Sequence, residues 1–303
     1  MSKPLLVTIA GPTAVGKTAL ATKIAIKFNT EIVSADSRQF YRELEIGTAK
    51  PSSRELSAAK HHFINSHSIR DLFSAGEFGR QAVQTISAIH QENPVVVAVG
   101  GSSLYLKAIW EGFDEMPEVD TDIRERLNEE IKKKGLSVLL EELERKDPEY
   151  YQEVDRNNGQ RIIRALEVIG STGKPFSFYR KNKSEDLPYR NLKIGLGMDR
   201  EVLFQRINQR MDLMIEEGLF EEAESLIGFK NHNALQTVGY SEIFGYLDGE
   251  YDKAEAIRLL KRNSRRYAKR QMTWFRRYDD IHWFMPGQEN EIIKLIEGSL
   301  LDK

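Results

Sequence analysis

The stretch LLVTIAGPTAVGKTALATKIAIKF, residues 5–28, decides the fold. Residues 5–10 are apolar apart from one threonine, which is typical of a buried strand, and residues 17–28 repeat Leu20, Ile24 and Phe28 at helical spacing. The segment between them fits the pattern G-x-x-x-x-G-K-[ST] and comprises Gly11, Pro12, Thr13, Ala14, Val15, Gly16, Lys17 and Thr18. A strand, this loop and a helix in that order predict a phosphate-binding loop in an α/β protein.

The chemistry expected of this loop is the binding of a polyphosphate. Its glycines let backbone amides close around phosphate oxygens, and the helix N-terminus adds partial positive charge. Lys17 is expected to neutralise phosphate charge, and the Thr18 hydroxyl is a candidate ligand for Mg²⁺. The alternative is a glycine-rich turn with no ligand, which the flanking strand and helix disfavour.

Asp36 is the acid best placed to act beside this loop. In P-loop nucleotide hydrolases a second carboxylate usually follows a hydrophobic strand, but the predicted strand at 95–99 is followed by Gly100-Gly101-Ser102. Asp36 directly follows the predicted strand at 31–35. Because ligands of parallel sheets lie at the carboxyl ends of the strands, Asp36 and the loop should face one crevice. The alternative is that Asp36 only caps a turn.

Periodicity along the rest of the chain alternates between strand and helix. Further strands are predicted at 193–198 and 281–285, and helices at 77–90, 201–226, 240–247 and 254–277. After about residue 113 the strands stop and a charged, helix-favouring stretch follows.

We therefore predict an α/β fold, with a parallel sheet of the P-loop nucleoside-kinase kind flanked by helices. The core comprises residues 1–113 and 193–303, and residues 114–192 form a helical insertion.

Composition excludes several kinds of chemistry. The chain of 303 residues has no cysteine, so disulfides, thiolate metal sites and cysteine nucleophiles are excluded. The sequence shows no targeting peptide and no apolar run of membrane-spanning length. We expect a soluble, cytoplasmic protein without a membrane partner.

Basic residues gather in two stretches although the formal net charge is -2. The first comprises Arg156, Arg161, Arg164, Lys174, Arg180, Lys181 and Lys183. The second comprises Arg258, Lys261, Arg262, Arg265, Arg266, Lys269, Arg270, Arg276 and Arg277. Local fields decide where a phosphate backbone docks, so both are candidate RNA contacts. A solvated helix face is an equally open interpretation of the second stretch.

Several motifs together carry a family resemblance. In chain order they are DSRQ (36–39) with Tyr41, IGTAKP (46–51), RIIRALEV (161–168) with TGK (172–174), Arg206-Ile207 with Arg210, Gly239-Tyr240, and YAKRQ (267–271) with TWFR (273–276). In this order and over nearly the whole chain, they resemble the tRNA dimethylallyltransferase family, also called isopentenyl diphosphate (IPP) transferases.

The resemblance implies a reaction. Such enzymes transfer the dimethylallyl group of dimethylallyl diphosphate to N6 of an adenine in tRNA, which we expect to be position 37 in the anticodon loop. It implies catalytic roles for Asp36, Ser102 and Arg210, with Asp36 accepting the N6 proton and Arg210, Lys17 and Mg²⁺ stabilising the departing diphosphate.

The resemblance also implies a tRNA path. The residues expected along it are Asp36, Ser37, Arg38, Gln39, Ser102, Arg124, Gln160, Arg161, Ile162, Ile163 and Arg164. The adenine would be flipped out of its stack to reach Asp36, while the insertion grips the anticodon stem. No obligate protein partner is expected.

Three positions depart from the family pattern. Ser102 stands where threonine is usual, Asn157-Asn158-Gly159 precedes Gln160 where asparagine and proline are usual, and Asn263 stands where threonine is expected. They affect expectations about substrate preference rather than about the reaction.

Other interpretations remain open beside this one. A P-loop kinase would transfer phosphate from ATP, and a non-catalytic module would retain RNA without turnover. Arg210 can be read as one more solvent-facing arginine of an amphipathic helix. His61, His62 and His67 lack the further ligands of a recognisable metal site, and Tyr267, Trp274 and Phe275 are expected in the core.

Overall fold

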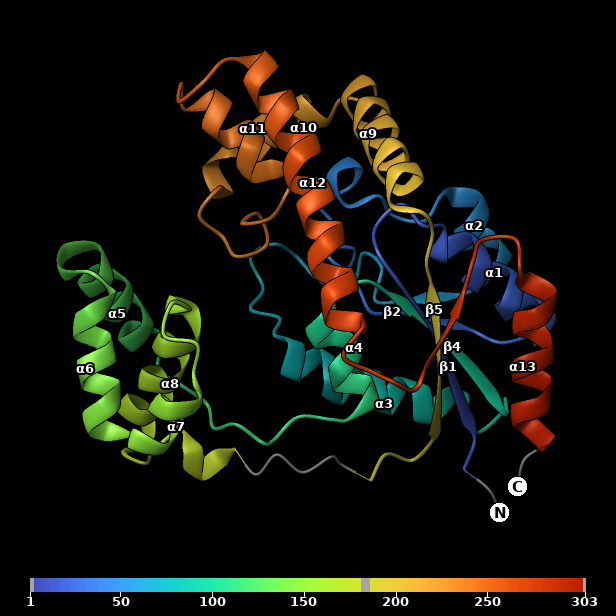
Figure 1. Ribbon diagram of the computed structural model, residues 1–303, viewed down its shortest axis with the longest axis horizontal. Helices are drawn as coiled ribbons and strands as arrows, with labels where there is room; N and C mark the ends of the chain where they lie inside the picture. Colours follow the sequence, from blue (N-terminus) through green and yellow to red (C-terminus); the bar gives the residue numbers. More distant parts are fainter. Residues whose placement is uncertain (1–2, 181–185, 302–303) are drawn as a thin grey trace. The chain divides into compact units, whose positions relative to one another are not determined.

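The computed structural model describes residues 3–180 and 186–301 and divides the chain into two units (Figure 1). The core comprises Met1–Glu111 and Asp186–Lys303, and Gly112–Glu185 forms the insertion. The boundary expected after residue 192 would cut strand β5, Arg190–Leu196, whose first residue pairs with Leu5. The first residues of β5 are polar, so the apolar pattern did not reveal that the strand begins at Arg190. Lys181 and Lys183 lie outside the described residues.

A parallel sheet in the order β3-β2-β4-β1-β5-β6 lies at the centre of the core. Its strands are β1 (Leu5–Ala10), β2 (Ile32–Ser34), β3 (His61–His62), β4 (Val95–Gly100), β5 and β6 (Ile281–Phe284). The predicted α/β fold is confirmed. The two-residue β3 is too short to show a periodicity, so the sequence did not predict it. Because all strands run the same way, their carboxyl ends meet at one edge.

Helices cover both faces of the sheet. They are α1 (Lys17–Lys27), α2 (Ser53–Ala58), α3 (Ala75–Ile89), α4 (Ser103–Trp110), α9 (Arg200–Glu216), α10 (Leu219–Ser225), α11 (Tyr240–Leu247), α12 (Lys253–Phe275) and α13 (Glu289–Leu301), with 3₁₀ turns η1 (Ile46–Thr48) and η3 (Ile227–Phe229). On one face α1 and α13 pack side by side, with Lys27 paired to Glu297 at 3.7 Å. On the other, the Trp110 indole of α4 donates to the Thr8 hydroxyl at 3.0 Å. Within residues 3–180 and 186–301 no helix is long and apolar enough to cross a membrane.

The single helix predicted at 201–226 is two helices. After α9 the chain enters the left-handed region at Gly218, whose φ is 102° and which caps the N-terminus of α10. Glycine adopts this backbone conformation without steric cost, so it ends one helix and starts the next in a new direction. Residues of both helices line the small hollow described below, Met211 and Met214 from α9 and Leu219 from α10.

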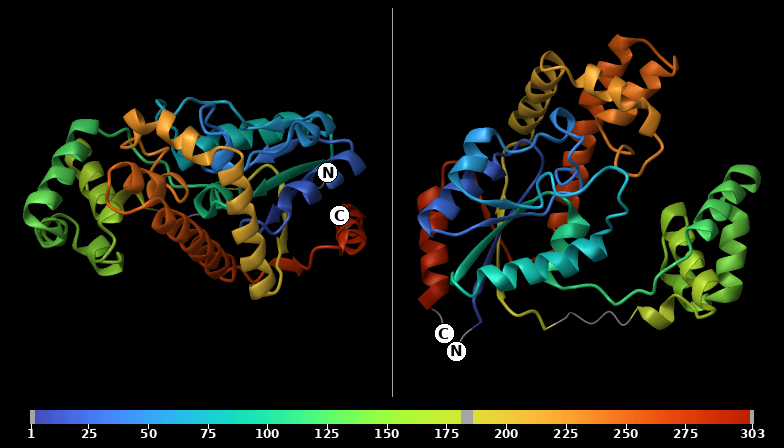
Figure 2. Two further views of the ribbon diagram at one scale, coloured as in Figure 1. Left: turned by 90° about the horizontal axis from the view of Figure 1, so that it is seen from above. Right: turned by 180° about the vertical axis from the view of Figure 1, so that it is seen from behind.

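The insertion is helical, as expected from its composition. Its elements are α5 (Thr121–Lys134), α6 (Leu136–Lys146), α7 (Pro148–Glu153), α8 (Gly159–Thr172) and η2 (Ser177–Tyr179). Figure 2 shows the four helices packed on one another, around a core that includes Leu139, Leu143, Ile162 and Leu166. This cluster gives the insertion its own apolar core.

Candidate active site

The phosphate loop joins β1 to α1 in the geometry that its glycines require. Gly16 is left-handed, with φ 104°, and a Cβ on Gly11 would lie 2.6 Å from the Leu196 carbonyl oxygen. Larger residues would therefore be strained at Gly16 and would clash at Gly11. Of the eight predicted residues, those that line a hollow in the surface are Thr13, Ala14, Gly16, Lys17 and Thr18, while Gly11, Pro12 and Val15 are buried behind it.

Lys17 is held over the loop by its own backbone. The ammonium donates to the Pro12 carbonyl oxygen at 2.8 Å. Burial and, after it, the neighbouring Arg210 lower the pKa of Lys17 to about 8, and Asp36 opposes both. A cation destabilised in this way gains most from an anion placed beside it.

Asp36 follows β2 and faces the same hollow as Lys17, as predicted. One carboxylate oxygen, Oδ1, accepts from the backbone N–H groups of Arg38 at 2.9 Å and Gln39 at 3.4 Å. Asp36 therefore does cap a turn. The other oxygen, Oδ2, accepts no hydrogen bond from the residues that the structure describes, so one oxygen fixes the carboxylate while the other is available.

Ser102 lies beside Asp36 but is turned toward Ser37. Its hydroxyl accepts from the Ser37 N–H at 3.0 Å and donates to the Ser37 hydroxyl at 3.2 Å. The side chain is buried and is not part of the hollow wall. The hydroxyl preserved at this position thus holds the turn that presents Asp36.

Two arginines reach the site with buried nitrogens that lack partners. Arg210, on α9, donates from Nη2 to the Thr13 hydroxyl, and Arg38 donates from Nη1 to the Ser37 carbonyl at 2.8 Å. The Nε atoms of both are buried and have no partner among the described residues. Burial also lowers the pKa of Arg210. Unsatisfied buried donors are costly, so an acceptor atom of a ligand that reached them would be stabilised. The solvent-facing interpretation of Arg210 is wrong.

The large hollow, of about 370 Å³, is where these groups meet. Its lining comes from the phosphate loop, from Asp36 and Gln39 after β2, and from Arg206 and Arg210 of α9. Its volume is in the range of small-molecule sites, and the cations Lys17, Arg206 and Arg210 suit a polyanion.

The small hollow, of about 100 Å³, shares Thr13, Asp36, Thr48 and Arg210 with the large one. Its remaining wall is partly apolar and includes Met211, Met214, Leu219, Val238 and Tyr267. Asp36 thus lines both a hollow rich in cations and a hollow of mixed lining, in which Arg38 and Arg210 accompany the apolar side chains.

Asn263, one of the three departures from the family pattern, supports the small hollow. Its amide donates to the buried Glu242 carboxylate at 2.7 Å, and Glu242 accepts from the Gly239 N–H at 2.8 Å. Gly239 is part of the hollow wall. Asn263 thus contributes to the shape of the site without facing it.

Sequence patterns missed two residues of α12 that belong to the site. Gln271 accepts from the Thr13 N–H and donates to the Gly101 carbonyl, both at 2.9 Å, which ties the phosphate loop to the turn after β4. Tyr267, expected in the core, faces the small hollow, and burial together with Asp36 raises its pKa to about 12. A buried glutamine in an otherwise apolar helical stripe was the available signal. Phe275 is buried as expected, and Trp274 stacks on Trp110.

In the insertion, two arginines expected on the tRNA path share one buried acid. Glu167 is 3% exposed and pairs with Arg124 Nε and with Arg164 Nη1, each at 3.1 Å. Arg161 and Gln160 are exposed at the start of α8. Asn158, within the second departure, caps this helix by accepting from the Arg161 N–H at 3.2 Å.

Ile162 and Ile163 have a different environment from their neighbours. Their side chains are buried in the apolar core of the insertion, because they occupy the inner face of α8. The structure therefore gives these two side chains a packing role, and their predicted place along the tRNA path stays a prediction. The exposed face of α8 leaves Gln160, Arg161 and Arg164 for contact with tRNA.

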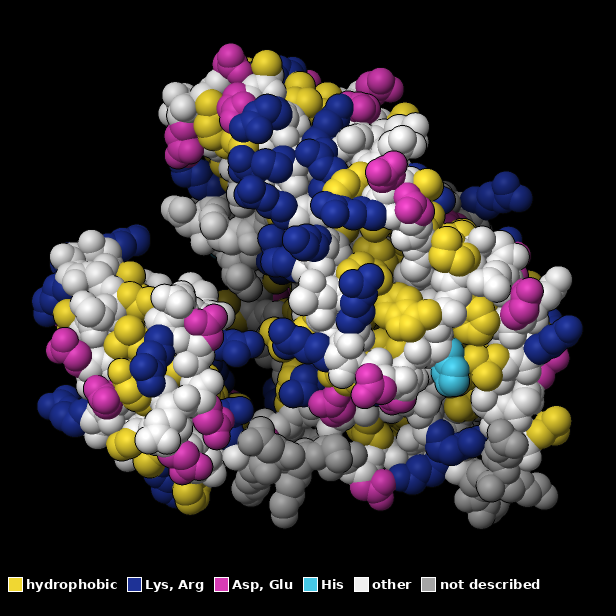
Figure 3. Space-filling view, in the orientation of Figure 1, with side chains coloured by type: hydrophobic (Ala, Val, Ile, Leu, Met, Phe, Trp, Pro, Cys, Tyr) yellow, Lys and Arg dark blue, Asp and Glu magenta, His cyan; other side chains and the backbone are white. Residues whose placement is uncertain are grey.

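The second basic stretch forms a visible band along α12. Lysine and arginine side chains gather over this helix in Figure 3. Arg258 pairs with Glu255 and Lys261 with Asp212, whereas Arg266, Lys269 and Arg270 are exposed. Part of the band is thus ion-paired surface, and part is open to a polyanion.

Thr18 of the phosphate loop is the residue predicted to ligate Mg²⁺. No cluster of three or more His, Asp or Glu side chains in residues 3–180 and 186–301 is arranged to hold an ion. Thr18 and Asp36 both face the large hollow, where phosphate oxygens would supply the further ligands that Mg²⁺ requires.

Comparison with known proteins covers nearly the whole chain. The family model described as IPP transferase matches residues 39–278. The tRNA dimethylallyltransferase of Cytophaga hutchinsonii is 48% identical over 295 residues, 97% of each chain. That of Christiangramia forsetii is 50% identical over 279 residues, 92% of each chain.

Solved structures of related proteins superpose on this chain over most of its length. The full-length tRNA isopentenylpyrophosphate transferase of Bacillus halodurans is 39% identical and superposes with a TM-score of 0.74, covering 99% of this chain and 98% of that one. A eukaryotic dimethylallyltransferase, captured in crystallographic snapshots acting on tRNA, is 26% identical with a TM-score of 0.75, covering 93% of this chain and 74% of that one.

Proposed function

The chain belongs to the IPP transferase family and has tRNA dimethylallyltransferase activity, and on that premise we propose that Asp36 is the general base for transfer to adenine N6. The observation that carries the proposal is the difference in hydrogen bonding between the two oxygens of the Asp36 carboxylate. Oδ1 is fixed by two backbone N–H groups, and Oδ2 is available at the junction of the two hollows.

The donor in this proposal is dimethylallyl diphosphate. Its diphosphate lies in the large hollow, where loop amides, Lys17 and Arg210 neutralise it, and its five-carbon group lies toward Met211 and Met214 of the small hollow. The cations of the large hollow match the diphosphate, and the methionine side chains of the small hollow match the hydrocarbon end. C1 is then next to Asp36.

The reaction is a substitution at C1. The lone pair of adenine N6 forms the new N–C bond while the C1–O bond breaks, and the diphosphate leaves with that electron pair. Oδ2 of Asp36 takes the proton that N6 loses. Arg210 and Lys17 stabilise the charge that develops on the leaving oxygen, because their donors are already directed into the hollow. Ser102 acts by holding Ser37 and the Asp36 turn.

The residues present fit a magnesium ion bound with the diphosphate. Thr18 would hold it, as the hydroxyl of a phosphate loop does, with phosphate oxygens and water completing the shell. When bound, the ion supplies further charge for the leaving group.

The acceptor in this proposal is the tRNA anticodon stem-loop, with adenine 37 flipped toward Asp36. The DSRQ turn at 36–39 meets the base, and Arg124, Gln160, Arg161 and Arg164 meet the backbone of the stem. Nothing in this recognition requires a protein partner.

One experiment separates this function from its rivals. The chain is incubated with Mg²⁺, total tRNA and either dimethylallyl diphosphate labelled in the prenyl group or ATP labelled in the γ-phosphate. We expect prenyl label in N6-(dimethylallyl)adenosine at position 37 after nuclease digestion. Phosphate transfer from ATP would instead identify a kinase, and tRNA retention without label would identify a binding module.

A further inference from the structure

A short loop, residues 45–49, separates the two hollows. Thr48 lines both of them, Ala49 lines the large one and Gly47 lines the small one. Arg210 on α9 also lines both hollows, as does Asp36. The position of the loop is therefore one of the features that shape the space beside Asp36.

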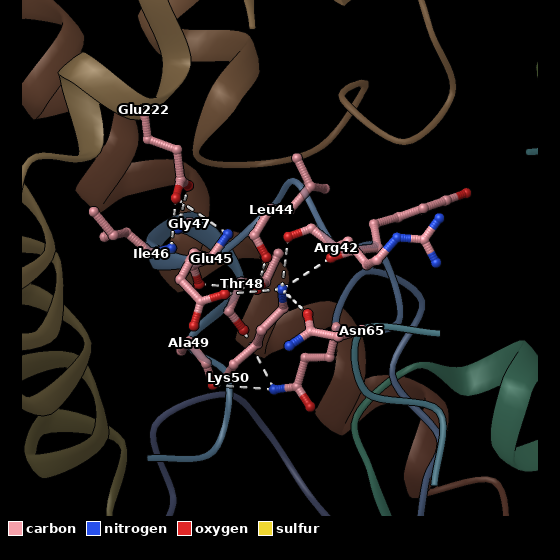
Figure 4. Close-up of polar contacts among 12 residues, drawn as sticks. Arg42, Leu44, Glu45, Ile46, Gly47, Thr48, Ala49, Lys50, Asn65 and Glu222 are labelled. Atoms are coloured by element: carbon pink, nitrogen blue, oxygen red, sulfur yellow. Dashed lines mark hydrogen bonds and ion pairs between the residues drawn. The ribbon is translucent and has the colours of Figure 1, made fainter. Parts of the chain in front are cut away.

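Glu222 of α10 binds this loop by its backbone. The carboxylate oxygen Oε2 accepts from the N–H groups of Glu45 at 3.1 Å and Ile46 at 2.8 Å, and Oε1 accepts from that of Gly47 at 2.9 Å (Figure 4). The Tyr240 hydroxyl also donates to Oε1. One carboxylate thus accepts four hydrogen bonds. Hydrogen bonds to an ionised acceptor are stronger than those between neutral groups.

The other side of the loop is fixed to the core. The Lys50 ammonium, whose side chain is 2% exposed, donates to the Tyr41 carbonyl at 2.9 Å and to the Glu45 carboxylate at 3.1 Å. Gln39 donates to the carbonyl oxygens of Thr48 at 3.3 Å and Ala49 at 3.0 Å. The inner side is thereby held to the elements that carry Asp36, and Glu222 joins the loop to α10.

The helix α10 directly continues α9 through Gly218. By binding the loop to α10, Glu222 therefore also connects the loop to the neighbouring helix α9, which carries Arg210. The contact is close, because a Cβ on Gly47 would lie 2.5 Å from Cζ of Tyr240. Glycine at this position lets the loop lie directly against the Tyr240 ring.

We propose that Glu222 is a positioning residue for the transfer reaction: it fixes the 45–49 loop, whose Thr48 lines both hollows together with Arg210, and so sets the shape of the prenyl diphosphate site. This rests on the proposed function, because the ligand of the hollows is taken to be dimethylallyl diphosphate. Glu222 does not face the hollows and acts through the loop backbone.

The test compares steady-state kinetics of the full-length chain with those of Glu222→Ala, using labelled dimethylallyl diphosphate and anticodon stem-loop RNA. We expect kcat/KM for the donor to fall about 10- to 100-fold, since misplacement of a site by about 1 Å costs rate on that scale. The dissociation constant of the RNA, measured without donor, should stay within about twofold of the parent value, because the basic side chains expected to bind the stem lie elsewhere.

Three further variants separate positioning from general stability. Glu222→Gln keeps one carbonyl oxygen and should recover at least half of the lost activity on a logarithmic scale. Gly47→Ala leaves Glu222 intact but forces the loop from Tyr240, and it should reproduce the donor-specific loss. Glu224→Ala removes an exposed acid from the same helix and is the matched control, with parental kinetics expected.

The outcomes are distinct. Parental donor kinetics in Glu222→Ala would overturn the inference while leaving the proposed function intact. If Glu222→Ala does not fold, parental donor kinetics in both Glu222→Gln and Gly47→Ala would overturn it. Failure of the parent chain to transfer the labelled group to RNA would overturn the proposed donor and the inference with it.

Discussion

Arginine side chains differ between the two units in how they are paired. In the core, Arg38 and Arg210 have buried Nε atoms with no partner among the described residues. In the insertion, Arg124 and Arg164 are both paired with Glu167, at 3.1 Å each, and their guanidinium groups are partly exposed. These two arginines of the core thus keep hydrogen-bonding capacity in reserve, whereas these two arginines of the insertion are already balanced by Glu167.

This difference suits the two kinds of charge that the substrates bring. A leaving diphosphate gains charge during the reaction, and donors held in a desolvated site stabilise that change strongly. The phosphates of tRNA carry full charge throughout, so exposed cations that displace counterions are sufficient. Substitutions in the core should therefore change the rate of transfer, and substitutions in the insertion should change RNA affinity.

Asp36→Asn should have the largest effect in either unit. The amide keeps size and can still accept at Oδ1, but it cannot take the N6 proton, and general-base catalysis typically contributes about 10²- to 10⁴-fold. We expect the single-turnover rate constant to fall on that scale, while the affinity for RNA remains near that of the parent.

Asp279→Asn is a suitable control for Asp36→Asn, because it makes the same carboxylate-to-amide change at an exposed position outside both hollows. Transfer by Asp36→Asn within a few-fold of the parent rate would show that Asp36 only positions the adenine. Proton acceptance would then pass to water or to the diphosphate.

Arg210→Ala should have the next largest effect. It removes a donor aimed at the leaving group, and loss of one such donor costs about 10²- to 10³-fold in rate. Donor binding should weaken as well. Pre-steady-state kinetics at saturating donor separates the two effects. A variant that loses only RNA affinity would place Arg210 outside the diphosphate site.

The sequence indicated the parts of the site that depend on local backbone. The phosphate loop was recognisable because two glycines and a lysine have fixed places in it, and Asp36 because it follows a strand. Gln271 was not recognised as part of the site, since its partner Thr13 lies 258 residues away. Glu222 escaped notice for the same reason, because a glutamate on an amphipathic helix does not reveal which backbone it meets.

The inward and outward faces of α8 were also not separated by the family motif. The run QRIIR, residues 160–164, carries the resemblance as one unit, but helical geometry turns Ile162 and Ile163 into the core. The apolar character of these two residues gave the correct orientation, and periodicity alone would have assigned them to packing.

The pKa of Lys17 gives a pH-dependent comparison within the core. Because burial lowers it to about 8, the free chain loses this proton as the pH rises through 8, and a neutral amine attracts diphosphate less. Diphosphate favours the charged form, so its affinity should fall as pH rises above 8, by up to about tenfold per pH unit. Isothermal titration from pH 7 to 9.5 measures this.

Lys17→Arg is the control for that titration, since its guanidinium stays charged throughout the range. The ratio of parent to variant affinity removes the ionisation of the diphosphate itself. An equal pH dependence in both proteins would show that Lys17 does not titrate in this range.

The smallest effects are expected in the insertion, where Arg161 and Arg164 differ in a way that sharpens the contrast with the core. Arg161 is exposed, so Arg161→Ala should raise the Michaelis constant for tRNA several-fold and reduce the slope of log affinity against log salt by about one. Arg164→Ala should do the same and also lower the free energy of unfolding by about 1 kcal/mol, because Glu167 is buried and loses one of its two partners. Filter binding between 50 and 200 mM salt, roughly the range over which phosphate contacts are most visible, measures RNA affinity, and urea denaturation measures the free energy of unfolding.

Arg161→Lys keeps the charge and should keep the salt slope, which tests whether charge rather than guanidinium geometry matters there. The Michaelis constant for the donor should be unchanged in all three variants. If tRNA affinity is also unchanged in both alanine variants, these arginines are not at the RNA interface, and the band of lysine and arginine side chains on α12 becomes the surface to test.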